Sequence, residues 1–466
     1  MSRVMHATRW RMNYGKPQAE LYLLAAERLA AGADHSRTTP ERQAFRKVGV
    51  VGAGTMGSGI AMALCDAGIP TVIVESEKAP LIRGLESIRN NYEISRSRGR
   101  LSAAEIETRM ALLTTSLEYG ALEEADLVIE AVFENLDLKQ AVFRKLDLVC
   151  KPGALLATNT STLDVNAIAS VTQRPTNVLG LHFFSPANVM KLLEIVRATR
   201  TSLDAIVSGL ALARQIGKTA VVVGVGFGFV GNRMLEPYAR EAHRLLLEGA
   251  TVRQIEGVLT DFGFKMDPLS MYDLAGIDVG HSVRESRRAA FAQDPSYQIM
   301  GDKLYALGRY GMKTGRGFYR YDGRTKLDDP EVDALALGTA IELGVRRRGI
   351  ANHEILERCI YALINEGAEA LRVGVAFRAS DCDVIWCNGY GFPRTRGGPM
   401  YYADTIGLER VLTAIERYRA ALGEYGQAWF NPSPLLVQLV RDRKTFAAFD
   451  GDVIANRLDM PHATGV

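Results

Sequence analysis

The chain has 466 residues, a length that predicts two or three domains. Its formal net charge is +3, so it lacks the large basic excess of a dedicated nucleic-acid-binding protein, and no apolar run reaches the length of a membrane span. A chain with 47% hydrophobic and 23% charged residues can bury sizeable cores, which excludes disorder for most of its length. Its five scattered cysteines form no CxxC pair, which argues against a disulfide framework or a metal site and favours a reducing, cytoplasmic environment.

Residues 1–44 are expected to form a short appendage. Residues 21–31 have helical propensity and an apolar stripe, and a stretch of turn-forming residues follows them. We interpret this part as a docking helix and a linker without chemistry. Arg3, Arg9 and Arg11 precede the first acidic residue, which leaves a mitochondrial presequence as a minor alternative to a bacterial, cytoplasmic protein.

Residues 45–225 alternate between short apolar runs typical of strands and longer stretches typical of helices. This alternation predicts an α/β domain in which a mostly parallel sheet is covered by helices on both faces. The predicted strands comprise residues 47–51, 71–75, 127–131, 155–159, 178–184, 192–196 and 220–223.

From about residue 226 the pattern changes to helices joined by Gly-rich connections. Two segments there share an order of features: a long helix, an aromatic-Gly-Phe segment and a stretch that ends at a glycine. The first contains Phe262-Gly-Phe264, and the second contains Tyr390-Gly-Phe392, 128 residues later. We therefore predict two related all-α domains, residues 226–330 and residues 345–466.

A glycine-rich turn follows the first predicted strand. The segment KVGVVGAGTMGSGIAMAL places Gly52, Gly54 and Gly57 between a strand and a helix, in the GxGxxG spacing of a dinucleotide-binding turn. Gly52 permits the tight turn, Gly54 lets the backbone approach a pyrophosphate, and Gly57 lets the helix pack on the strand. Free N–H groups at the start of the helix would then hold the pyrophosphate.

The acidic residue expected in such a site is Glu75, which ends the second predicted strand 23 residues after Gly52. A carboxylate there bonds both ribose hydroxyls and repels a 2′-phosphate, so NAD is favoured over NADP as the cofactor. The structural alternative is a Rossmann-like turn without a ligand.

A histidine and a glutamate lie in the two apolar strands of LGLHFFSPANVMKLLEIV. Taken alone, His182 is more often a core residue than a catalyst. If the strands pair antiparallel around a turn centred at Asn188, His182 faces Glu194. A carboxylate opposite an imidazole fixes its tautomer and stabilises its protonated form, as a general base requires. The alternative is a buried structural ion pair.

Two polar residues are candidates to complete this site. Ser161 follows the strand in LLATNTST, at the carboxyl edge where open parallel sheets bind ligands. Asn232 follows VGVGFGFVG and opens the first long helix. For both residues the alternative is a helix cap.

These segments together resemble the 3-hydroxyacyl-CoA dehydrogenases of fatty-acid oxidation, and more narrowly the dehydrogenase half of the multifunctional β-oxidation enzymes. The resemblance runs from about residue 46 to beyond residue 407. It rests on GAGTMGSGIA, DLVIEAVFENLDLK, TNTSTLDV, GLHFFSPANVMKLLEIV, GFGFVGNRM, GRYGMKTGRGFYRYD and GYGFPRTRGGPMYYAD. It implies a Rossmann-type NAD-binding domain followed by helical C-terminal domains.

The resemblance also implies that a Ser-His-Glu-Asn set carries out the reaction. By motif this set is Ser161, His182, Glu194 and Asn232. His182 is then the base for oxidation of an (S)-3-hydroxyacyl-CoA to the 3-ketoacyl-CoA with NAD, and Ser161 and Asn232 bind the substrate. Glu134 and Lys139, in ENLDLK, are implied to lie near the nicotinamide end of the cofactor.

The multifunctional enzymes carry a hydratase/isomerase half before the dehydrogenase half, whereas only about 45 residues precede the first predicted strand here. We therefore expect no hydratase or isomerase activity. The expected partners are an acyl-CoA substrate and, as open alternatives, a second copy of the chain or a separate hydratase or thiolase. Two other functions stay open: the dehydrogenation of another β-hydroxy acid, and a catalytically weak scaffold subunit.

Overall fold

The computed structural model describes residues 18–32, 45–323 and 325–451. The predicted N-terminal helix is confirmed as α1 (Gln18–Ala30). Most of the predicted linker, and the arginines near the N-terminus, lie outside the described residues.

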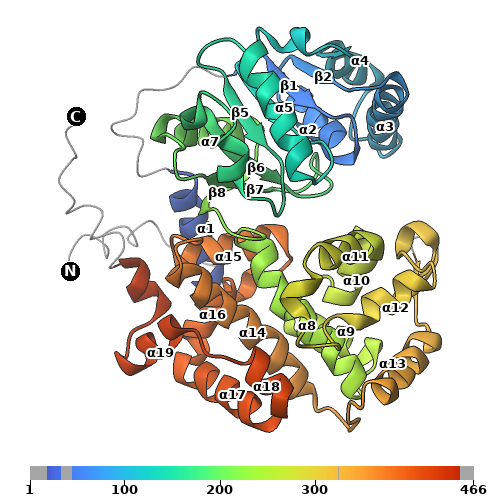
Figure 1. Cartoon of the computed structure of the whole chain (residues 1–466), viewed down its shortest axis with the longest axis vertical. Coiled ribbons are helices and arrows are strands. Elements are labelled where there is room, and N and C mark those ends of the chain that lie inside the picture. The colour runs from blue at the N-terminus through green and yellow to red at the C-terminus, as the bar shows by residue number, and fades with distance from the viewer. Residues whose placement is uncertain (1–17, 33–44, 324, 452–466) are drawn as a thin grey trace. The chain divides into compact units, whose positions relative to one another are not determined.

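The described residues fall into two compact units (Figure 1). The sheet unit comprises Leu23–Gly231 and Gly374–Phe377. The helical unit comprises residues 18–22, Asn232–Val373 and residues 378–451, as far as these residues are described. The sequence analysis did not predict that a short segment after residue 373 packs with the sheet; its Val375 carbonyl accepts a hydrogen bond from the Gly224 N–H at 2.8 Å.

The sheet unit contains one eight-stranded sheet with the strand order β3-β2-β1-β4-β5-β6-β7-β8. Neighbouring strands are parallel except β6 and β7, which pair antiparallel. The order β3-β2-β1-β4-β5-β6 is that of a Rossmann fold, which binds ligands beyond the carboxyl ends of β1 and β4. The strands are β1 (Val48–Val51), β2 (Thr71–Val74), β3 (Leu113–Ser116), β4 (Leu127–Glu130), β5 (Leu155–Thr158), β6 (Val178–Phe183), β7 (Leu192–Arg197) and β8 (Thr219–Gly224).

All the predicted strands are present, each within one residue at either end. The sequence analysis missed β3, which has the polar sequence LTTS and pairs with β2 at the edge of the sheet. None of its side chains is buried. Because an exposed edge strand needs no apolar side chains, its sequence lacks the apolar run from which a strand is predicted.

Helices cover both faces of the sheet, as the alternating pattern predicts. Ile129 of β4 packs with Ile60 of α2 in the core on one face, and the neighbouring Val128 packs with Phe143 of α5 in the core on the other. The helices of this unit are α2 (Thr55–Asp66), α3 (Lys78–Ser97), α4 (Ala103–Ala111), α5 (Leu136–Val149), α6 (Val165–Ala169) and α7 (Leu203–Gln215).

The helical unit shows the predicted repeat in its contacts. Asp273 in α10 (Pro268–Ala275) accepts hydrogen bonds from the N–H groups of Phe318 and Tyr319 at 2.8 and 3.0 Å. Asp404, at the equivalent place in α16 (Pro399–Ile406), accepts hydrogen bonds from the N–H groups of Phe446 and Ala447, also at 2.8 and 3.0 Å.

The first part of the helical unit contains α8 (Gly231–Glu248), α9 (Val252–Phe262), α10 (Pro268–Ala275), α11 (Ile277–Ser286), α12 (Ile299–Ala306), a hairpin of β9 (Arg320–Asp322) and β10 (Thr325–Leu327), and α13 (Pro330–Glu342). The second part contains α14 (Asn352–Arg372), α15 (Ala379–Gly389), α16 (Pro399–Ile406), α17 (Leu408–Ala421), α18 (Gly423–Trp429) and α19 (Pro434–Arg441).

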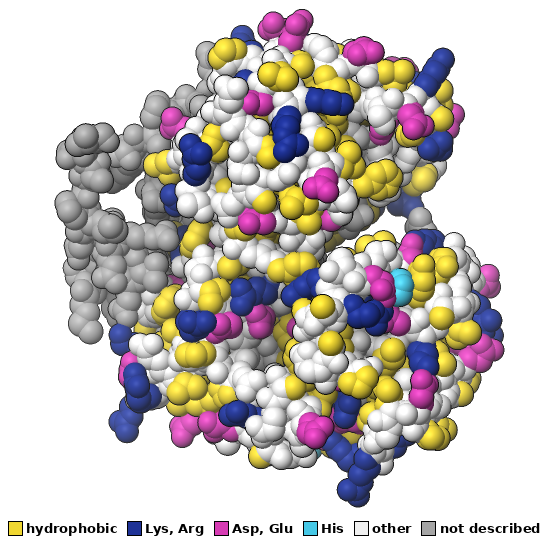
Figure 2. All heavy atoms as spheres, viewed as in Figure 1, with side chains coloured by type: hydrophobic (Ala, Val, Ile, Leu, Met, Phe, Trp, Pro, Cys, Tyr) yellow, Lys and Arg dark blue, Asp and Glu magenta, His cyan; other side chains and the backbone are white. Residues whose placement is uncertain are grey.

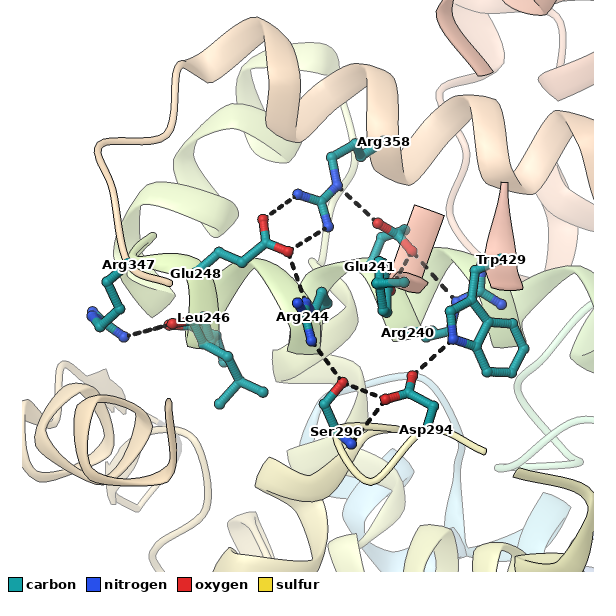
Figure 3. A network of polar contacts seen from close by, with 12 residues as sticks. Arg240, Glu241, Arg244, Leu246, Glu248, Asp294, Ser296, Arg347, Arg358 and Trp429 are labelled. Atoms are coloured by element: carbon teal, nitrogen blue, oxygen red, sulfur yellow. Dashed lines mark hydrogen bonds and ion pairs between the residues drawn. The ribbon is translucent and has the colours of Figure 1, made fainter. Parts of the chain in front are cut away.

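A buried network of charged side chains joins the long helices of the two repeats (Figure 3). Arg358 on α14 is fully buried and donates hydrogen bonds to Glu241 and Glu248 on α8, at 2.8 and 2.6 Å. Arg244 donates a further bond to Glu248 at 2.7 Å. Burial opposes the ionisation of Glu248, but the two arginines outweigh it and lower the pKa of this carboxyl.

Replacing Arg358 by methionine should destabilise the helical unit by about 2–3 kcal/mol. Breaking a buried ion pair on one side usually costs about 3–5 kcal/mol, and here Arg244 still pairs with Glu248. The matched control is Arg417→Met, because Arg417 also pairs with a glutamate of α14 but its side chain is 54% exposed. The control should cost at most about 1 kcal/mol. Equal losses in urea unfolding followed by circular dichroism would contradict the account of this network.

The surface carries both signs of charge. Figure 2 shows acidic and basic side chains interspersed over the face drawn, in keeping with the small net charge. Among the described residues, no helix combines the length and the apolarity that a membrane crossing requires. None of the five cysteines, all of them described, forms a disulfide, and all five are buried.

Candidate active site

The turn between β1 and α2 has the glycine geometry of a dinucleotide site. Gly52 has φ +104°, and a Cβ there would lie 2.7 Å from the carbonyl oxygen of Ala131. A Cβ at Gly57 would lie 1.9 Å from the carbonyl oxygen of Gly52, so both positions require glycine. A Cβ at Gly54 would meet nothing within 4 Å, which leaves room for a ligand. No side chain caps the start of α2, so its first N–H groups can bind a pyrophosphate.

Glu75 lies directly beside this turn. Its Oε2 accepts a hydrogen bond from the Ala53 N–H at 2.9 Å, and its Oε1 accepts one from the Ser76 N–H at 2.7 Å. The carboxylate is thereby fixed against the glycine turn, just after the end of β2, where a Rossmann fold binds the ribose. An uncapped helix start and an acidic residue beside it both fit NAD.

His182 on β6 and Glu194 on β7 are paired as predicted. The antiparallel register places them opposite each other, and His182 Nδ1 lies 2.7 Å from Glu194 Oε2. Glu194 is fully buried, and its Oε1 accepts hydrogen bonds from the N–H groups of Gly231 and Val230 at 2.9 and 3.3 Å. The carboxylate is therefore held at both oxygens and fixes the imidazole through Nδ1. This contact leaves Nε2 as the ring nitrogen that could exchange a proton.

Two aromatic rings flank the imidazole. The ring centroids of Phe184 and Phe229 lie 4.4 and 5.5 Å from that of His182. Phe229 has φ +49°, which is a rare backbone conformation for a bulky residue. Strained residues of this kind cluster at functional sites, so this feature favours a catalytic pair over a merely structural ion pair.

Ser161 and its neighbours are hydrogen-bonded to Glu134. The Oε1 atom of Glu134 accepts hydrogen bonds from the Thr160 hydroxyl at 2.6 Å and from the N–H groups of Ser161 and Thr162 at 2.8 and 3.0 Å. Its Oε2 lies 3.4 Å from the ammonium group of Lys139. Burial opposes the ionisation of Glu134, but Lys139 and these hydrogen bonds outweigh it and lower the pKa of the carboxyl. A charged Glu134 thus organises the turn that carries Ser161.

The helix-cap alternative for Ser161 does not apply. The N-cap residue of the following helix, α6, is Asp164, whose side chain accepts a hydrogen bond from the Asn166 N–H. The polar atoms of Ser161 are instead bonded to Glu134.

Lys139 is buried and forms an ion pair with Glu130, a residue that was not predicted from the sequence to belong to the site. Its side chain is 1% exposed, and its ammonium group donates a hydrogen bond to Glu130 at 2.7 Å. Glu130 ends β4 and is fully buried, and its other oxygen accepts a bond from the Thr158 hydroxyl at 2.8 Å. The available signal was an acidic residue at the end of the apolar strand in DLVIE. A place for Glu134 and Lys139 near the nicotinamide stays a prediction.

Asn232 belongs to the helical unit. It is the second residue of α8, so it lies inside the helix and is not its cap. Its Oδ1 accepts a hydrogen bond from the Tyr390 hydroxyl at 2.7 Å. Tyr390 was predicted only as part of the repeat. The signal for a further role is a tyrosine at the position where the first repeat has Phe262.

Two family profiles match this chain. The profile described as "3-hydroxyacyl-CoA dehydrogenase, NAD binding domain" matches residues 47–226. The profile described as "3-hydroxyacyl-CoA dehydrogenase, C-terminal domain" matches twice, over residues 228–321 and 355–448. The two C-terminal matches cover the two segments that the sequence analysis predicts to be related.

Solved structures of dehydrogenases share this fold. The 3-hydroxybutyryl-CoA dehydrogenase of Escherichia coli is 28% identical, with a TM-score of 0.73, and the match covers 88% of this chain and 100% of that one. The (S)-3-hydroxybutyryl-CoA dehydrogenase of Ralstonia eutropha is 35% identical, with a TM-score of 0.55 and coverages of 60% and 100%. The dehydrogenase part of multifunctional enzyme 1 from C. elegans is 28% identical, with a TM-score of 0.65 and coverages of 91% and 99%.

Curated relatives are named as peroxisomal enzymes. The "Peroxisomal bifunctional enzyme" of Danio rerio is 45% identical over 91% of this chain, and that of Homo sapiens is 42% identical over 87%. The chain spans only 61% and 58% of the lengths of these two relatives.

The prediction of a cytoplasmic location is wrong, because vertebrate and plant relatives alike are named peroxisomal. A bacterial relative, the fatty acid oxidation complex subunit alpha of Shewanella, also matches at 34% identity. The prediction rested on the scattered cysteines. The absence of a disulfide among the five described cysteines does not separate one reducing compartment from another.

The fold and the comparisons agree on the family. Both domain profiles match in chain order, and a solved dehydrogenase that is 35% identical is covered over its whole length. The chain belongs to the 3-hydroxyacyl-CoA dehydrogenase family, and its sheet unit contains the NAD-binding domain.

Proposed function

We propose that this protein oxidises (S)-3-hydroxyacyl-CoA to 3-ketoacyl-CoA with NAD, as a step of fatty-acid β-oxidation. The observation that carries the proposal is the His182–Glu194 pair on adjacent strands of an NAD-binding domain. The names of solved relatives as 3-hydroxybutyryl-CoA dehydrogenases support the substrate class. The names of curated relatives point to the peroxisome.

In the proposed reaction, Nε2 of His182 accepts the proton of the C3 hydroxyl. Glu194 stabilises the imidazolium that forms, while the Gly231 N–H holds the carboxylate in place. NAD, when bound, would accept the hydride that leaves C3. The Ser161 hydroxyl, which donates to Glu134 in the structure, would turn to donate to the C3 oxygen or the thioester oxygen, and Asn232 would donate a second hydrogen bond there. Together these two bonds would set the geometry of the substrate.

The stereochemistry of the substrate tests this proposal directly. With NAD, the protein should oxidise (S)-3-hydroxybutyryl-CoA and leave the (R) enantiomer unchanged, because one fixed imidazole can reach the hydroxyl on only one side of C3. Equal rates with the two enantiomers would contradict the proposal. The expectation of no hydratase activity stays a prediction, as does association with a second copy or with a separate hydratase or thiolase.

Replacing Glu134 by glutamine should lower kcat/KM about tenfold, because the neutral side chain loses the contact with Lys139 and holds the Ser161 turn less firmly. Steady-state kinetics with acetoacetyl-CoA and NADH measure this loss. The matched control is Glu107→Gln, because Glu107 is an exposed glutamate that pairs with Arg89 on the surface. An equal effect of the two substitutions would contradict the role of Glu134.

The effect of Glu134→Gln on the free energy of unfolding should depend on pH. The pKa of Glu134 is lowered in the folded protein, so its ionised form contributes stability at any pH above the ordinary glutamate value of about 4.3. This contribution is lost as the pH falls through the lowered pKa. The difference in unfolding free energy between the wild type and Glu134→Gln should therefore be constant near neutral pH and shrink in acid. A difference that grew in acid would contradict the assignment.

A further inference from the structure

A tyrosine of the second helical repeat holds Asn232 of the first. The Tyr390 hydroxyl donates its hydrogen bond to Asn232 Oδ1 at 2.7 Å, across 158 positions of the chain. The Tyr390 ring is 7% exposed and stacks on Trp386, with the ring centroids 4.8 Å apart. The packed ring gives the hydroxyl a fixed direction.

In this bond the Tyr390 hydroxyl meets the accepting end of the Asn232 amide. A carboxamide has an accepting end and a donating end, and rotation of the group by about 180° exchanges them. A hydroxyl that donates to Oδ1 favours the orientation in which the Nδ2 group points away from Tyr390. A thioester oxygen can only accept a hydrogen bond, so the proposed reaction needs the donating end of Asn232 and not its oxygen.

The first repeat shows that the hydroxyl is not needed for packing at this position. The counterpart of Tyr390 is Phe262, in the matching Phe262-Gly-Phe264 segment. The ring of Phe262 packs edge-on against Phe392 and Tyr402, with centroids 5.7 and 5.1 Å apart. A phenyl ring therefore satisfies the repeat fold there, and what the tyrosine adds in the second repeat is the bond to Asn232.

We propose that Tyr390 is a positioning residue for the dehydrogenase reaction, which fixes the Asn232 amide so that its N–H groups face the acyl-CoA substrate. The proposal rests on the proposed function. It gives the second helical repeat a part in substrate recognition, beyond its packing on the first repeat.

The test is a double-mutant cycle with Tyr390→Phe, Asn232→Ala and the combined variant. Tyr390→Phe is expected to lower kcat/KM for acetoacetyl-CoA about tenfold, with the KM for NADH unchanged and the melting temperature lowered by no more than a few degrees. In the Asn232→Ala background it should cause no further loss, because the two residues act through one bond. The matched control is Tyr418→Phe, which removes a hydroxyl bonded to Glu357 at 2.8 Å in the same repeat and should leave kcat/KM unchanged.

The result that would overturn the proposal is a loss of the same size with and without Asn232, or no loss at all. Calorimetric titration of acetoacetyl-CoA in the presence of NAD measures substrate binding without turnover. The same four proteins then give a double-mutant cycle for the binding free energy. Coupling in binding with no turnover by the wild type would support the positioning role and contradict the proposed dehydrogenase activity. Turnover without coupling would overturn the positioning role alone, and a wild type that neither binds nor turns over acetoacetyl-CoA would overturn both.

Discussion

Replacing His182 by glutamine is expected to lower kcat about 10²–10⁴-fold, which is the usual contribution of a positioned general base. Glutamine is close to histidine in size and can still reach Glu194, but its amide does not accept the proton of an alcohol. NADH binding should be unchanged, because the glycine turn joins β1 to α2 and Glu75 follows β2, so neither lies on β6. Steady-state kinetics with acetoacetyl-CoA and a calorimetric titration of NADH measure the two effects separately.

A second histidine–carboxylate pair supplies the control. His281 in α11 lies 2.8 Å from Asp302 and stacks on Tyr305 with the ring centroids 3.8 Å apart. His281→Gln disturbs a comparable pair elsewhere in the chain, so kcat should stay within about twofold of the wild type. Full activity of His182→Gln, or an equal loss in both variants, would show that His182 is not the base.

Replacing Glu194 by glutamine should also lower kcat about 10²–10⁴-fold. The buried carboxylate is the group that stabilises a positive charge on His182, and its loss leaves the imidazolium without a counter-charge. A glutamine whose oxygen keeps the bonds from Gly231 and Val230 presents its amino group to Nδ1, which forces the wrong tautomer on the imidazole.

The pH dependence of kcat separates this role from a structural one. The profile of Glu194→Gln should be displaced from that of the wild type, because the group that offsets the imidazolium charge is gone. Glu194→Asp keeps the charge and is the matched control, with a smaller loss of rate and a profile close to that of the wild type. A profile of Glu194→Gln identical to that of the wild type would contradict the assignment of Glu194 as the partner of the base.

The features that the sequence predicts best are those set by local residue patterns, namely the register of the strand pair and the glycine turn. The period of the two apolar strands sets their register, because a slip of one residue would move every side chain to the other face, and the structure confirms His182 opposite Glu194. The glycine spacing likewise predicts the turn, since a Cβ at Gly52 or Gly57 would clash with the backbone.

The features that sequence reasoning missed depend on residues distant in the chain. In the sequence, Glu130 is an acidic residue at the end of a strand like many others. Only the fold shows that it pairs with Lys139. Tyr390 has no local signal of its contact with Asn232, because 158 positions separate the two. Ser161 and Asn232 were each expected either in the site or as a helix cap, and only the observed helix starts at Val165 and Gly231 remove the caps.

Reduction of acetoacetyl-CoA by NADH is the measurement that tests the central claim most directly. The account predicts that the purified chain consumes NADH in proportion to added acetoacetyl-CoA, forms the (S)-3-hydroxy product, and loses this activity in His182→Gln. A wild type that binds NADH and acetoacetyl-CoA but turns over neither would contradict it.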